Sequence, residues 1–131
     1  MLFRSNSVGG DVSGGLTRVK ALAVYNNELY VGGEFFSAGS IGIPVNGIAR
    51  WNGIKWDSVP GGVPDCYWVN AFYVDTVNNF LYVGYSGGPV GDEGVARWDG
   101  FKWSTFKNGM SGSSGVYGLA IYHYQIGRAH V

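Results

Sequence analysis

The stretch that decides the fold is IARWNGIKW at residues 48–56, which returns as VARWDGFKW at residues 95–103. The copies lie 47 positions apart, and their Arg, Trp, Gly, Lys and Trp positions are identical. An upstream block, LYVGG at residues 29–33, returns as LYVGY 52 positions later. Repetition at a period near 50 residues predicts a row of similar supersecondary units. The unequal spacings place the length changes in turns, where insertions are tolerated.

Each repeat contains four short segments rich in Val, Ile, Tyr and Trp, separated by turn residues, which is typical of strands. In the first repeat these predicted strands are residues 19–25, 28–35, 47–51 and 54–58. The first of them, VKALAVY, matches VNAFYV at residues 69–74 and VYGLAIY at residues 116–122. No window shows the 3.6-residue apolar period of a helix. The sequence therefore predicts an all-β protein with essentially no helix.

The Asn-Gly pair at residues 52–53 predicts the turn of the last hairpin. Asn-Gly and Asp-Gly favour a two-residue type I′ turn, because both central residues need a positive φ. Such a turn would place Trp51 opposite Ile54 on an apolar face of the hairpin. It would also place Arg50 opposite Lys55, an unfavourable pair of like charges. Asp57 nearby is one residue that would relieve it.

Several further residues are expected to serve the architecture in each repeat. Asn26-Asn27 is predicted to turn the first hairpin, since Asn tolerates the left-handed region. The glycine pair that ends the second strand predicts a close backbone approach or a bulge. The repeated tryptophans are predicted to lie in the core. The structural repeat residues are Gly32, Gly33, Trp51, Gly53, Trp56, Trp98, Gly100 and Trp103.

These blocks resemble a kelch-like β-propeller repeat, in which an apolar run and two glycines precede an aromatic position and a spaced tryptophan. The Ala-Arg-Trp-Asn/Asp-Gly-x-x-Trp hairpin is most similar to propeller blades of bacterial secreted and cell-surface proteins. The resemblance implies an open fragment of a β-propeller, with two four-stranded antiparallel blades and partial flanking blades. The predicted organisation is a preceding blade tail (1–18), two blades (19–62 and 63–110) and a first strand (111–125).

Residues 126–131, IGRAHV, are what a common sequencing-library adapter encodes when it is read in frame. We expect these six residues to be an artefact of a metagenomic-type library rather than part of the protein. The third repeat also stops where the next LYVG block is due. The chain is therefore expected to be a fragment whose missing blades would cover its open faces. Alone, residues 1–125 are expected to be marginally stable or prone to aggregate.

Composition excludes several classes of function. The chain of 131 residues has 9 Lys+Arg, 9 Asp+Glu and a formal net charge of zero, which argues against a nucleic-acid footprint. The sequence contains no run of about 18 apolar residues, so it does not predict a membrane span. The 23 glycines, with 46% hydrophobic and 16% aromatic residues, favour a turn-rich β protein over a disordered one.

No catalytic, cofactor-binding or metal-binding residues are predicted, and no cofactor is expected. Cys66 has no neighbouring base in sequence, so we interpret it as a buried or bystander thiol. His123 stands where Asn26 stands in the first repeat, which favours a turn residue over a metal ligand. The acidic loop at residues 91–94 lacks the spacing of a calcium loop and is interpreted as a solvated turn.

Tyr67 and Trp68 are the candidate ligand contacts, because they lie in the connection between repeats, where a propeller offers a rim. Packing of Trp68 beneath that loop is the favoured alternative, and a largely buried Trp68 would exclude the ligand role. We predict a non-enzymatic scaffold or binding module of a secreted or cell-surface protein that contacts protein or carbohydrate. The alternatives are a glycan-active or copper-oxidase-like propeller enzyme with its site in other blades, and an intracellular kelch adaptor.

Overall fold

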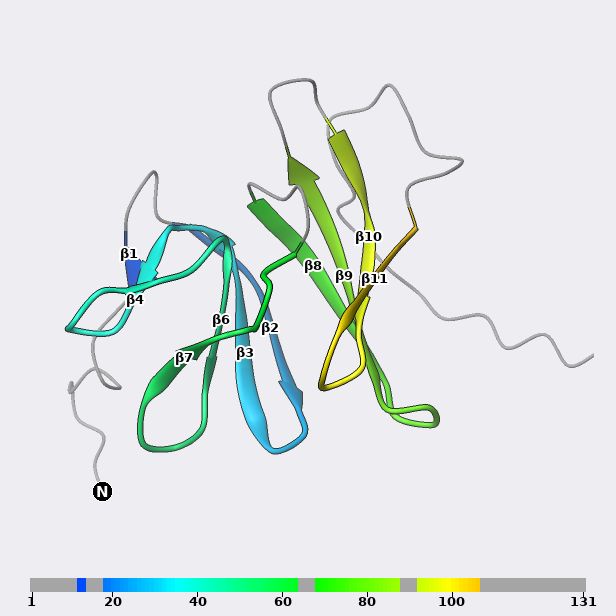
Figure 1. Cartoon of the computed structure of the whole chain (residues 1–131), viewed down its shortest axis with the longest axis horizontal. Helices are drawn as coiled ribbons and strands as arrows, with labels where there is room; N and C mark the ends of the chain where they lie inside the picture. The colour runs from blue at the N-terminus through cyan, green and yellow to red at the C-terminus, as the bar shows by residue number, and fades with distance from the viewer. Residues whose placement is uncertain (1–11, 14–17, 64–67, 88–91, 107–131) are drawn as a thin grey trace, which may run out of the picture.

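The computed structural model describes residues 12–13, 18–63, 68–87 and 92–106. This part of the chain is all-β and contains no helix, as the repeat pattern predicts. It holds two four-stranded sheets and one small three-stranded sheet (Figure 1). The first sheet has the order β2-β3-β6-β7, with β2 (Arg18–Tyr25), β3 (Glu28–Glu34), β6 (Ile48–Trp51) and β7 (Trp56–Ser58). The second sheet has the order β8-β9-β10-β11, with β8 (Trp68–Asp75), β9 (Phe80–Gly87), β10 (Asp92–Trp98) and β11 (Trp103–Phe106).

Each four-stranded sheet is an antiparallel meander, and the two are equivalent strand by strand. The spacing differences in the sequence lie between strands, as expected. In the first hairpin Tyr25 pairs with Glu28, whereas in the second sheet Asp75 pairs with Phe80 across a longer loop. The Asn26-Asn27 turn is confirmed, since both residues have positive φ, 52° and 63°.

The prediction for the last hairpin of each sheet was wrong. Trp51 pairs with Trp56 and not with Ile54, so the loop spans four residues instead of two. The side chain of Asn52 explains this, because its Oδ1 accepts hydrogen bonds from the backbone N–H groups of Ile54 (2.8 Å) and Lys55 (3.0 Å). Ile54 is therefore 83% exposed at the loop tip and does not belong to the apolar face.

The corrected register also removes the expected clash of like charges. Arg50 pairs in the ladder with Asp57, and its guanidinium lies 3.9 Å from the Asp57 carboxylate and 3.7 Å from that of Glu28. The second sheet repeats the same four-residue loop. Asp99 Oδ1 accepts from the N–H groups of Phe101 and Lys102, and these hydrogen bonds hold the pKa of Asp99 below its ordinary value.

The predicted close approach at Gly32-Gly33 is confirmed at both glycines. A Cβ on Gly33 would overlap the backbone carbonyl of Arg18, where β2 carries a bulge. A Cβ on Gly32 would meet Phe72 at 2.8 Å and would also overlap Val69 of the second sheet. These glycines therefore let β2 and β8 approach β3 closely.

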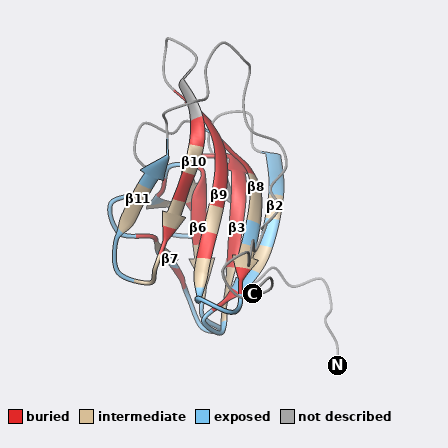
Figure 2. Ribbon diagram, turned by 90° about the vertical axis from the view of Figure 1, so that its right-hand side faces the viewer, coloured by how far each residue is buried: buried red, intermediate tan, exposed pale blue. Residues whose placement is uncertain are grey.

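The main core lies between the two four-stranded sheets, which pack face to face (Figures 1 and 2). The first sheet contributes its tyrosine face, defined by Tyr25, Tyr30 and Ile48. The second sheet contributes its tryptophan face, defined by Leu81, Trp98 and Trp103. Of the four repeated tryptophans predicted as core, Trp98 and Trp56 are buried, while Trp51 and Trp103 are partly buried.

A small sheet lies beside the first sheet, on the side away from the second (Figure 1). It consists of β1 (Val12–Ser13), β4 (Ser37–Ala38) and β5 (Ile43–Pro44), which the sequence did not predict. The β3–β6 connection that contains β4 and β5 contributes Phe35, Ala38 and Val45 to a second apolar cluster. That cluster includes Val31 and Trp56 and covers part of the outer face of the first sheet.

Candidate functional site

Two equivalent β-bulges form the base of the candidate site. In β2 the register shifts between Val19 and Ala21, and in β8 it shifts between Val69 and Ala71. The extra residues are Lys20 and Asn70. A bulge re-aims the side chain of its extra residue and bends the strand. The first strands of the two sheets therefore present polar side chains at the same position.

The two bulge residues join across the sheets in a group that we call the bulge network: Arg18, Lys20, Glu34, Asn70 and Ser86. Lys20 Nζ lies 2.8 Å from Glu34 Oε2 and donates to Asn70 Oδ1 over 3.1 Å. Asn70 Nδ2 donates to Ser86 Oγ over 2.8 Å, and Arg18 Nη1 lies 3.7 Å from Glu34. Glu34, Asn70 and Ser86 are buried, so the network is part of the packed structure.

Glu34 and Ser86 occupy equivalent positions, as do Lys20 and Asn70. The same framework thus carries a charged pair in the first sheet and a neutral pair in the second. Buried polar groups are hydrogen-bonded in folded proteins, and here each partner comes from the neighbouring strand or the neighbouring sheet. The cations of Arg18 and Lys20 are the members that reach solvent, whereas the amide of Asn70 and the hydroxyl of Ser86 are buried and bonded to each other. Sequence reasoning missed it, although polar residues at one equivalent position of otherwise apolar strands were the available signal.

Trp68 is the first residue of β8 and lies beside the bulge network. It pairs in register with Ser86, two residues before Asn70. Trp68 is 37% exposed, so it is not largely buried. Tyr67 and Cys66 lie outside the described residues, as does His123. The structure therefore brings one of the two predicted contact residues next to a polar cluster that was not predicted.

The structural repeat residues lie in the framework and not in this site. Gly53 and Gly100 have φ values of 101° and 102°, as the tips of equivalent hairpins. The rings of Trp51 and Trp56 contact each other at a tilt of 57°, with centroids 5.5 Å apart, and those of Trp98 and Trp103 do so at 44° and 5.0 Å. Trp103 Nε1 also donates to the carbonyl of Pro60 over 3.0 Å.

A hydrogen bond from Tyr25 links the two sheets at the opposite end of their first strands. Its hydroxyl donates to the carbonyl of Asn79 over 2.8 Å. Burial raises the pKa of Tyr25 above its ordinary value, and the neighbouring Tyr30 raises it further. The phenol therefore stays protonated and keeps its role as a donor through neutral pH.

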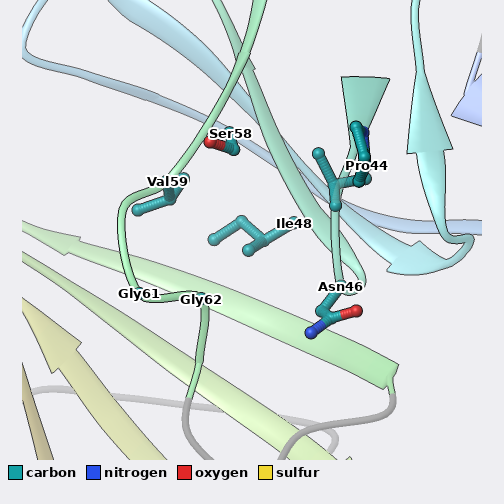
Figure 3. Close-up of a pocket in the computed structure, with 8 residues that line it drawn as sticks. Pro44, Asn46, Ile48, Ser58, Val59, Gly61 and Gly62 are labelled. Carbon is teal, nitrogen blue, oxygen red and sulfur yellow. The ribbon is translucent and has the colours of Figure 1, made fainter. Parts of the chain in front are cut away.

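A cavity of about 230 Å³ opens between the β5–β6 turn and the connection that follows β7 (Figure 3). Ile48 projects into it between Val59 and Asn46. Its lining residues are Pro44, Val45, Asn46, Ile48, Ser58, Val59, Gly61 and Gly62. None of these lining side chains titrates near neutral pH.

Across the described ranges, no three His, Cys, Asp or Glu side chains gather closely enough to hold a metal ion. The prediction of a solvated turn at residues 91–94 was wrong for Asp92 and Glu93, which lie in β10 and pair with Gly87 and Ser86. Their side chains are not among those described. No helix in the described residues is long and apolar enough to cross a membrane. Comparisons with family models, with curated proteins and with solved structures found no match to this chain.

Proposed function

We propose that the chain is part of a β-propeller-type scaffold built from kelch-like blades, which serves as a non-enzymatic binding module of a secreted or cell-surface protein. Its two four-stranded meanders support this, because they stack with equivalent strands in the same order. Further blades of the same polypeptide would extend the stack. Repeat proteins of this kind present ligand sites on a framework that changes little from unit to unit.

The observation that carries the proposal is the combination of a constant framework and different polar residues at the bulges. Lys20 and Asn70 occupy the same backbone position, yet they present an ammonium in one sheet and an amide in the other. Trp68 stands beside them with an exposed ring. An exposed aromatic ring beside a cluster whose cations, Arg18 and Lys20, reach solvent is a suitable surface for a sugar ring or a peptide.

Titration calorimetry with a panel of soluble oligosaccharides tests the carbohydrate form of this proposal. We expect Trp68→Ala to weaken binding about tenfold, because exposed aromatic anchors carry much of the energy of such contacts. Phe101→Ala is the matched control, since Phe101 is exposed at a hairpin tip away from the bulge network. Equal losses in both variants, or no binding to any oligosaccharide, would contradict a carbohydrate site at Trp68.

Long-read sequencing of the parent gene tests the scaffold itself. We expect LYVGG-like and ARWDG-like blocks to recur about every 45–50 codons beyond the present chain, as the blades of one propeller. A signal sequence or surface-anchoring segment in the same gene would support the expected extracellular location. A gene with only two such blocks would rule out closure of a ring within one polypeptide.

A further inference from the structure

The two four-stranded sheets contact each other through different faces, so each leaves the opposite kind of face on the outside. Inside the chain, the tyrosine face of the first sheet meets the tryptophan face of the second. Outside, the first sheet therefore carries a tryptophan face with Leu29, Trp51 and Trp56. The second sheet carries a tyrosine face, whose residues include Tyr73, Tyr82 and Phe106.

The exposed part of the outer tryptophan face is an apolar strip on β2. Val19, Leu22 and Val24 are 50%, 64% and 68% exposed. We call these three residues the β2 strip. They are exposed although strand β3 on the same face is mostly buried, and Figure 2 shows β2 pale along the edge of the molecule. The β3–β6 connection covers the part of this face nearer β7 and leaves the strip open.

The residues of the second sheet that are equivalent to the β2 strip are packed against a neighbouring sheet. Val69 is fully buried, and Phe72 and Val74 pack against the core between the sheets. β8, which carries them, is the strand of the second sheet that contacts both β2 and β3. The β2 strip therefore has the composition of one half of an interface that is already present inside the chain.

The other half is present on the outer face of the second sheet. Gly32 gives Val69 and Phe72 room to approach the first sheet. Gly84 occupies the position of Gly32 in β9, paired with Ala71 and Val95 as Gly32 is paired with Ala21 and Ile48. Tyr82 likewise stands where Tyr30 stands in β3.

We propose that the β2 strip docks against the outer tyrosine face of a second copy of this chain, head to tail, as the second sheet docks against the first within one chain. This inference rests on the stacked-blade scaffold proposed above and applies to this chain on its own, because further blades of the same polypeptide would occupy the same two faces. The interface is heterologous, because the two patches differ and neither is complementary to itself. Such contacts build rings or open chains rather than closed two-fold dimers.

Sedimentation velocity of the full chain over a range of concentrations tests the proposal. We expect reversible, concentration-dependent association of the unmodified chain. Leu22→Lys on the β2 strip and Tyr73→Lys on the outer tyrosine face should each weaken association about tenfold or more, because each places a charge in an apolar contact. Ile54→Lys is the matched control, since Ile54 is exposed at a loop tip outside both faces and should associate as the unmodified chain does.

Mixing the two face variants distinguishes head-to-tail docking from other kinds of association. Each variant keeps one intact face, so the mixture should form a dimer of the two and nothing larger. A monomer at every concentration, association that no face variant weakens, or a mixture that stays monomeric would each overturn the proposal. Circular dichroism establishes that each variant is folded. Trp68 lies on the same outer face as Tyr73, so the oligosaccharide titration is carried out on the Leu22→Lys variant, which keeps that face intact but should not associate. Failure of the docking is then distinguishable from failure of the ligand site.

Discussion

Lys20 reaches a buried carboxylate from the bulge of β2, and the contact makes this residue sensitive to substitution. Lys20→Met would leave Glu34 buried without its 2.8 Å partner. Removing one member of a buried ion pair costs up to about 3–5 kcal/mol, and the partial exposure of Lys20 lowers our expectation to roughly 1–3 kcal/mol. Urea unfolding followed by tryptophan fluorescence measures the change in the free energy of unfolding.

Arg18→Met is the control for this prediction, because Arg18 is exposed and lies 3.7 Å from the same carboxylate. An ion pair whose cation is well exposed to solvent contributes roughly 0–1 kcal/mol. Adding Glu34→Gln to Lys20→Met should recover part of the loss, since the buried charge is then removed. A Lys20→Met variant as stable as Arg18→Met would show that the network is not a structural ion pair.

The Tyr25 hydroxyl predicts a dependence of stability on alkaline pH. Its pKa is higher in the folded state than the ordinary value of 10.0, so the folded state binds this proton more tightly than the unfolded chain does. Its stabilisation is complete below the unfolded pKa and is lost as the pH rises through the folded pKa. Tyr25→Phe should cost about 1 kcal/mol at neutral pH. The difference in unfolding free energy between the two chains should shrink as the pH rises above 10.0, as measured by urea unfolding at several pH values.

At the level of the elements, two glycines are required for different reasons. Gly33→Ala would push a Cβ into the backbone carbonyl of Arg18 and disturb the pairing of β2 with β3. The Cβ that Gly53→Ala adds would meet no atom within 4 Å, so the cost of this substitution comes only from the φ of 101° at position 53. We expect losses of roughly 1–3 kcal/mol in both variants, from overpacking in the first and from backbone strain in the second.

Asparagine separates the two causes, because it tolerates positive φ but is larger than alanine. Gly53→Asn should therefore be milder than Gly53→Ala, whereas Gly33→Asn should be no milder than Gly33→Ala. Thermal unfolding midpoints rank the four variants. The opposite ranking at either glycine would contradict the cause assigned to it.

The repeat alignment predicted all the strands of the two large sheets, because the alternation of apolar residues in each strand can be detected from the sequence of that strand alone. The Asn-Gly hairpin misled it, since the Asn52 side chain closes a four-residue loop that the dipeptide alone does not reveal. β4 and β5 were missed because two-residue strands have no periodicity to detect. The link between Lys20 and Asn70 depends on the packing of two sheets, which no local pattern encodes.

For the whole molecule, stability depends mainly on the core that the two large sheets share, the larger of the two apolar clusters in the described residues. Trp98 is buried there, and Trp98→Ala should cost about 3–5 kcal/mol. The free energy of unfolding of a domain is typically only about 5–15 kcal/mol. Because the β2 strip leaves apolar surface exposed, we expect this chain to lie near the lower value. We expect loss of the near-ultraviolet circular dichroism signal in Trp98→Ala at 25 °C. Trp68→Ala should keep that packing, so unfolding in both variants would contradict the role of the shared core.

The connection between β3 and β6 has a consequence for engineering. Between β3 and β6 it carries β4 and β5 of the small sheet, whereas a shorter segment joins the equivalent strands β9 and β10 of the second sheet. The ladder pairs nevertheless remain equivalent. The sheet register therefore does not depend on the length of this connection. Gly42 lies at its tip with a φ of 71°, and a Cβ placed on it would meet no atom within 4 Å. A peptide tag inserted there would be displayed to solvent on a framework that keeps its strand pairing.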